Sequence, residues 1–166
     1  FGVRNAHLLA VAPNASSSII CGNTSPSIEP YRANAFTQKT KSGSSLLKNE
    51  YLENCLQDID MDTEEVWKSI ITSGGSVQQL EFLDDYTKDV FKTAVEIDQK
   101  WIIEMAGDRQ QHICQSQSLN VFFPADVTKQ ELHAIHMMAW KQKVKTLDYL
   151  RSEAIKRAET VSDEAL

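Results

Sequence analysis

The chain of 166 residues is long enough for one domain, and with 42% hydrophobic and 24% charged residues its composition is that of an ordinary globular protein. Its formal net charge of −6 argues against a nucleic-acid partner, because non-specific binding to phosphates requires a basic surface. No apolar run approaches the ~20 residues that a membrane helix needs, and no signal peptide is visible, so no membrane partner is expected.

The first third of the chain alternates short apolar runs with turns. Residues 7–12 are nearly all apolar, which predicts a strand buried on both faces. Residues 16–21 predict a short helix that ends at Gly22. Residues 35–43 read as a strand that enters a turn, and residues 46–59 have helical spacing.

Three helices are predicted in the remainder. The first follows Asp62-Thr63 and ends at Gly74-Gly75, since glycine readily takes the left-handed conformation that closes a helix. The second covers residues 88–107 with an apolar stripe facing a core. The third opens at Thr128 with a capping box and reaches about residue 143. The stripe consists of Val90, Ala94, Ile97, Trp101 and Met105.

Two further strands are expected, at residues 118–123 and near residues 146–150, followed by a polar, acidic tail. Isolated buried strands between helices predict an α/β fold. Trp67, Trp101 and Trp140 fall within predicted helices, so core packing is the default expectation for all three.

The three cysteines, Cys21, Cys55 and Cys114, are far apart and show no C-x-x-C spacing. A disulfide framework or a zinc site is therefore not expected, and a reducing, cytoplasmic location fits best. Cys21 and Cys114 lie among apolar or small residues, which indicates buried, unreactive thiols.

The most unusual stretch is "APNASSSIICGN", residues 12–23, in which small hydroxyl residues follow an apolar run. A strand, a turn of small residues and a helix start together form a potential phosphate site. The first helical N–H groups lack internal partners, and the helix dipole favours an anion there. The turn has no lysine, so it is not a P-loop. Taken alone, the stretch favours a simpler interpretation in which one serine caps the helix and the others are solvated.

Three segments resemble the large, catalytic subunit of class I ribonucleotide reductase. They are "APNASSSIICGNTSPSIEPY", "ICQSQSLNVFFPADVTKQELHAIHMMAWKQKVKT" and "LDYLRSEAIKRAETVS". The resemblance follows the whole chain in order and is nearest to the bacterial and phage type. It implies an α/β fold, the helix-rich closing portion of a ten-stranded barrel. Residues 1–166 would be a partial domain, incomplete on its own, as the start at Phe1 also indicates.

The resemblance implies reduction of ribonucleoside diphosphates by radical chemistry, and it assigns roles to two places. The turn Asn14, Ala15, Ser16 and Ser17 would hold the substrate diphosphate through backbone N–H groups and hydroxyls. With this added, the functional interpretation of the turn becomes the favoured one.

The second place is a tyrosine pair that relays the radical in this family. Tyr149 matches the second tyrosine, whereas Asp148 stands where the first is expected. A carboxylate is not a practical one-electron relay, so Asp148 predicts that radical transfer fails at this step. Lys143 stands where relatives usually have glycine.

The resemblance places the radical cysteine and the reducing cysteine pair upstream of this segment, and none of the three cysteines present matches them. The implied partners are the remainder of the large subunit, the small subunit and a ribonucleoside diphosphate. The segment would bind no cofactor, because the family's metal–radical cofactor belongs to the small subunit. The alternative is a catalytically inactive homologue or split-gene remnant that serves as a binding or assembly module, which Asp148 favours.

Other polar clusters carry simpler explanations. His133 and His136 lie three residues apart without a third ligand, so no metal site is expected. The acidic residues 60–65 are explained by a helix start. Glu29 is expected to link the phosphate turn to the barrel through polar contacts, with no chemical role assigned.

Overall fold

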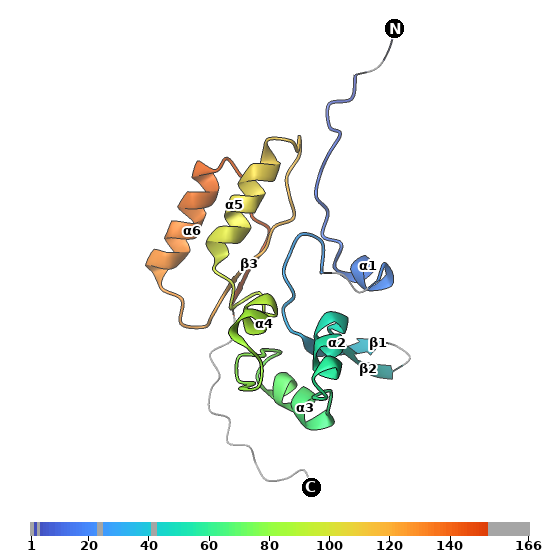
Figure 1. The fold of residues 1–166 in the computed structure, drawn as a ribbon. Coiled ribbons are helices and arrows are strands. Elements are labelled where there is room, and N and C mark those ends of the chain that lie inside the picture. Colours follow the sequence, from blue (N-terminus) through green and yellow to red (C-terminus); the bar gives the residue numbers. More distant parts are fainter. Residues whose placement is uncertain (1, 3, 23–24, 41–42, 153–166) are drawn as a thin grey trace.

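The computed structural model describes residues 2, 4–22, 25–40 and 43–152. Within these ranges the chain is a mixed α/β structure with two packing groups, one on either side of α4 (Figure 1). The elements are α1 (Ala15–Ile20), β1 (Ala35–Thr40), β2 (Gly43–Lys48), α2 (Glu50–Asp58), α3 (Glu64–Thr72), α4 (Asp85–Val90), α5 (Gln99–Gln110), β3 (Val121–Phe123), α6 (Lys129–Lys141) and β4 (Leu150–Ser152).

The first group packs α2 and α3 with the antiparallel hairpin of β1 and β2, which pairs Ala35 with Lys48. Asn34 holds the group together, because its side-chain amide donates to the carbonyl oxygens of Gly75 at 3.0 Å and Phe91 at 2.8 Å. The buried apolar residues of this core are Ala35, Leu52, Leu56, Trp67, Ile70, Val77, Leu80, Leu83 and Phe91.

The second group packs α5 and α6 on the parallel pair of β3 and β4, in which Phe122 faces Arg151 in register. Its buried apolar residues are Ala94, Ile102, Ile103, Ala106, Leu119, Val121, Phe122, Phe123 and Ala139. The described residues therefore form two separate two-stranded sheets, not a continuous barrel wall. The α/β prediction is confirmed at this coarser level.

Several predicted helix ends are confirmed, because local side-chain chemistry sets them. Thr63 caps α3 by accepting from the N–H of Val66. Thr128 and Glu131 form the expected capping box of α6. Beyond α3, the N–H groups of Gly74 and Gly75 bond to the carbonyls of Ile71 and Ile70, which is a Schellman ending.

The strand predicted at residues 7–12 is wrong. The segment forms only one bridge, between Val11 and Gln117, and the exposed fractions of Leu8 and Leu9 are 72% and 57%. A strand buried on both faces needs neighbours on both sides, and the described residues supply one neighbour only.

The single helix predicted at residues 88–107 is also wrong, because the chain turns between α4 and α5. The carboxylate of Glu96 accepts hydrogen bonds from both the N–H and the hydroxyl of Thr93, and Asp98 starts α5 by capping Lys100. The change in phase turns Trp101 and Met105 outward, with 51% and 57% of their surfaces exposed.

The predicted helix at residues 46–59 and the predicted burial of the tryptophans are each confirmed only in part. Residues 46–48 belong to β2, and Asn49 starts α2 by accepting from Tyr51. Trp67 is buried as expected, whereas Trp140 is 72% exposed on α6.

The predicted acidic tail, residues 153–166, lies outside the described residues. No helix in the described part of the chain has the length and apolar character to span a membrane.

Candidate functional site

The serine turn begins where the N-terminal arm touches the segment before β3. The N–H of Val11 donates to the carbonyl of Ser116 at 3.3 Å, and the N–H of Ser118 donates to the carbonyl of Val11 at 2.8 Å. The chain then leaves this contact through Pro13 and enters α1. The predicted order of strand, turn and helix is thus present, with a single bridge in place of the strand.

Asn14 is the N-cap of α1, and its side chain makes no capping hydrogen bond. Its carbonyl accepts from the N–H of Ser18 at 3.3 Å, and the backbones of Ala15, Ser16 and Ser17 form the first helical turn. Asn14 and Ser17 are exposed. The simpler interpretation, in which a serine caps this helix, therefore does not describe the structure. The N–H groups of a first helical turn have no acceptor within the helix.

The loop after α1 is tied back to the protein interior through Glu29. The Ser27 hydroxyl donates to the carbonyl of Ala12 at 2.9 Å, next to the turn. The buried Glu29 carboxylate accepts from the backbone N–H of Asn120 at 3.2 Å and from its side-chain amide. Oδ1 of Asn120 has no hydrogen-bond partner among the described residues. This geometry agrees with the linking role expected for Glu29.

Asp148 and Tyr149 lie along the opposite edge of the same segment. The N–H of Asp148 donates to the carbonyl of Leu119 at 2.8 Å, and the N–H of Val121 donates to the carbonyl of Tyr149 at 3.0 Å. Oδ2 of Asp148 accepts from the Ser118 hydroxyl at 2.6 Å. Tyr149 is 61% exposed, and the Arg151 guanidinium lies 5.0 Å from the centroid of its ring.

Residues 116–121 therefore connect the two places singled out in the sequence. Ser116 and Ser118 face the arm that leads into the serine turn, whereas Leu119 and Val121 face the chain that carries Asp148 and Tyr149. Backbone groups of successive residues alternate between the two edges of a strand, so one segment holds both neighbours.

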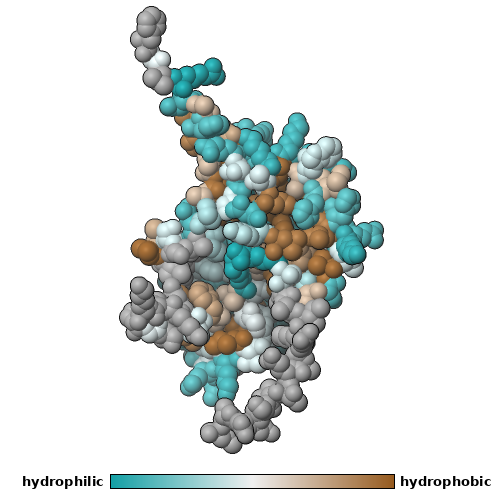
Figure 2. Space-filling model, turned by 180° about the vertical axis from the view of Figure 1, so that it is seen from behind, coloured by the Kyte–Doolittle hydropathy of each residue, from teal (hydrophilic) through white to brown (hydrophobic). Residues whose placement is uncertain are grey.

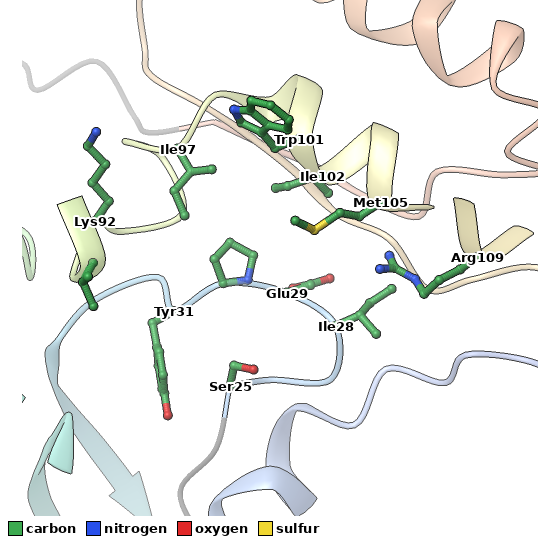
Figure 3. A pocket seen from close by; sticks show the side chains of 12 residues that line it. Ser25, Ile28, Glu29, Tyr31, Lys92, Ile97, Trp101, Ile102, Met105 and Arg109 are labelled. Atoms are coloured by element: carbon green, nitrogen blue, oxygen red, sulfur yellow. The ribbon is translucent and has the colours of Figure 1, made fainter. Parts of the chain in front are cut away.

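A cavity of about 340 Å³ lies between the loop after α1 and α5. Trp101, Ile102 and Met105 of α5 face Ile28 and the Glu29 loop across it (Figure 3). Most of its lining is apolar, so it is unsuited to a phosphate group. Two of its lining residues, Trp101 and Met105, are the exposed residues of α5 described above.

Cys114 is a feature that the sequence reasoning missed. The predicted buried thiols are both exposed, and Sγ of Cys114 lies 2.9 Å and 3.0 Å from the backbone N–H groups of Leu8 and Leu9. These N–H groups favour the thiolate and lower the pKa of Cys114. Its partners lie more than 100 positions away, so no local signal in the sequence points to them.

The polar clusters set aside earlier have structural partners. Nδ1 of His136 lies 2.7 Å from the carbonyl of Leu132, one helical turn away. Asp62 accepts from the indole N–H of Trp67 at 2.6 Å. In the described ranges, no group of three or more His, Cys, Asp or Glu side chains is placed to hold a metal ion.

Comparison with known proteins gives matches along nearly the whole chain. A family model described as the ribonucleotide reductase barrel domain matches residues 1–150. The ribonucleoside-diphosphate reductase large subunit of Invertebrate iridescent virus 6 is 54% identical, covering 97% of this chain and 17% of the viral protein. The putative large subunit of Frog virus 3 is 50% identical, covering 92% of this chain and 27% of that protein.

A solved structure is also similar. The Actinobacillus ureae class Id ribonucleotide reductase alpha subunit superposes with a TM-score of 0.76 at 39% identity, covering 86% of this chain and 25% of that one. The chain thus spans between 17% and 27% of the length of these three proteins. Of these three proteins, the two with the higher sequence identities are viral.

Proposed function

The chain belongs to the ribonucleotide reductase large-subunit family, and we propose that it forms the closing part of a barrel of the type that reduces ribonucleoside diphosphates, with the radical relay interrupted at Asp148. Residues 1–166 would be a partial domain of a ten-stranded barrel, and would act in the cytoplasm beside the remainder of the large subunit. The ordered match over residues 1–150 carries this proposal.

Within that barrel, the turn Asn14–Ser17 would bind the substrate diphosphate. The exposed Asn14 and Ser17, and a first helical turn whose N–H groups lack helical acceptors, support this role. The Asn14 side chain makes no capping hydrogen bond within α1, so its oxygen is not committed to the helix start. Glu29 and Ser27 brace the loop behind the turn, so that little ordering is required on binding.

Tyr149 would carry the radical on its way from the small subunit to the barrel cysteine. Its exposed ring is compatible with a relay partner contributed by another chain. The metal–radical cofactor would belong to that small subunit, so no residue of this chain is required to hold it. Asp148 occupies the neighbouring relay position, and its carboxylate cannot be oxidised by one electron at biological potentials.

The experiment combines this chain with the remaining large-subunit portion and a small subunit, and measures deoxyribonucleoside diphosphate formation. We expect no turnover with the natural chain and measurable turnover with Asp148→Tyr. Asp148→Phe is the matched control, because it supplies a ring without an oxidisable hydroxyl and should remain inactive. Full turnover with Asp148 in place would contradict the relay assignment.

The alternative function is that of an inactive binding or assembly module, and the Asp148 contact favours it. The short hydrogen bond from Ser118 gives the carboxylate a structural role, holding the chain before β4 against the segment before β3. If Asp148→Tyr restores no turnover although the assembled complex binds nucleoside diphosphate, this alternative is the correct one.

A further inference from the structure

Two arginines lie on one face of the β3–β4 pair. Phe122 and Arg151 are in register on neighbouring parallel strands, so their side chains project from the same side of the sheet. The guanidinium of Arg32 lies over the Phe122 ring, 5.7 Å from its centroid. The Arg151 guanidinium lies over the Tyr149 ring on the same strand face. Stacking on the two rings limits the movement of both cationic groups.

A cavity of about 300 Å³ opens between these two arginines. The hydrogen bond from the N–H of Ala94 to the carbonyl of Tyr31, at 2.7 Å, holds the Arg32 loop against the turn that forms one wall. Its described lining residues are Arg32, Ala94, Val95, Phe122, Arg151 and Ser152. The lining thus combines two arginines with the apolar side chains of Ala94, Val95 and Phe122.

The charges in this cavity are not balanced. Neither arginine takes part in an ion pair within the described part of the chain. Burial lowers the pKa of Arg32, the charge of Arg151 lowers it further, and the more weakly acting Glu29 opposes them. Glu29 is already committed to Asn120 and is absent from the described lining. A bound anion would relieve the repulsion between the two cations.

We propose that Arg32 and Arg151 form a binding site for a phosphoryl group of a small molecule. A phosphoryl dianion carries two negative charges, which match the two arginines, whereas a carboxylate carries one. The phosphoryl oxygens can each accept from the paired N–H donors of a planar guanidinium group. The cavity also has room beyond the phosphate for the group that carries it. This site is separate from the serine turn, with which it shares no residue, and it does not depend on the proposed reductase function.

The test is an NMR titration of the isotope-labelled chain, assembled with the remainder of the large subunit, with inorganic phosphate at constant ionic strength and chloride as the balancing anion. We expect saturable shifts in the backbone amides of Ala94, Val95, Phe122 and Ser152. Arg32→Gln and Arg151→Gln should each weaken binding about tenfold, the effect of losing one charge-assisted hydrogen bond. Arg4→Gln, which removes an exposed arginine outside the cavity, should leave the affinity unchanged.

Two outcomes would overturn the proposal. One is the absence of saturable shifts at these four amides in the natural chain, a result that needs no variant to fold. The other is unchanged affinity in the variant that lacks both arginines.

A second titration with a ribonucleoside diphosphate separates the two proposals. Shifts at residues 14–18 alone would locate the nucleotide at the serine turn, whereas shifts at the arginines would identify the nucleotide as a source of their phosphoryl ligand.

Discussion

Asp62 is the residue at which hydrogen bonding most clearly links sequence to stability. Its carboxylate accepts from the indole of the buried Trp67 and from the side-chain amide of Gln57, and Lys48 lies 3.5 Å away. The Trp67 bond, then the Gln57 bond and the Lys48 charge, lower the pKa of Asp62 from its ordinary value of 3.8. Burial opposes them without reversing the direction.

Because the folded-state pKa of Asp62 is depressed, its contribution to stability is complete above the unfolded-state pKa. That contribution is lost as the pH falls through the lower, folded-state value. We expect Asp62→Asn to flatten the fall in the free energy of unfolding below about pH 4. Urea unfolding at a series of pH values measures this, with Asp58→Asn, an exposed carboxylate at the end of α2, as the control. An identical acid limb in Asp62→Asn and the natural chain would refute the assignment.

Single residues of the site were predictable only in part. The resemblance identified Asn14–Ser17 and Tyr149, and the structure gives Asn14 and Ser17 exposed positions. The hydrogen bond from Ser118 to Asp148 spans 30 positions, so no local pattern could reveal it. The same holds for the Cys114 thiol and its two N–H donors on the N-terminal arm.

At the scale of elements, the end of α6 carries a residue in a costly conformation. The N–H groups of Lys143 and Val144 bond to the carbonyls of Trp140 and Ala139, which completes a Schellman motif. This motif requires a left-handed residue, and Lys143 has φ 60°. The corresponding position after α3 is Gly74, with φ 69°. The glycine that the resemblance leads us to expect at position 143 would take this conformation without a steric penalty.

We expect Lys143→Gly to raise the free energy of unfolding by about 1 kcal/mol, because glycine takes left-handed angles without a steric penalty. The matched control is Lys141→Gly, which places glycine inside the last turn of α6 and should lower stability by up to about 1 kcal/mol. Chemical denaturation measures both variants. Destabilisation by Lys143→Gly would show that the lysine side chain contributes more than its backbone conformation costs.

The elements that sequence patterns predicted correctly are those with local end signals. These signals act within one helical turn, so a short sequence pattern is enough to predict the helix end. They are Thr63, Thr128 and the Gly74–Gly75 pair. The break between α4 and α5 could not be predicted, because the helical spacing of apolar residues continues through it. At the break, the Glu96 carboxylate accepts hydrogen bonds from the N–H and the hydroxyl of Thr93. Helix propensity alone does not predict these contacts.

The described part of the molecule exposes several large apolar side chains. Hydrophobic side chains gather in a patch on the half of the molecule that carries β3 and α6 (Figure 2). Trp101 and Met105 line the open cavity beside α5. In the barrel proposed above, the remainder of the large subunit would cover these residues.

Adding that remainder should shift the tryptophan fluorescence of the chain to shorter wavelength, because the indole of Trp101 leaves water. Trp101→Phe should remove most of the shift. Trp140→Phe, which alters an exposed indole outside the cavity, should retain it. An unchanged shift in Trp101→Phe would place the contact on another face of the molecule.

Calorimetric titration of a ribonucleoside diphosphate into the chain assembled with the remainder of the large subunit tests the diphosphate turn most directly. We expect binding heat with the natural chain and at least about tenfold weaker binding when Ser16→Ala and Ser17→Ala are combined, since two hydroxyl donors are lost. Ser73→Ala, which alters an exposed serine after α3, should bind as the natural chain does. Unchanged affinity in the double serine variant, or no heat with the natural chain, would contradict the account.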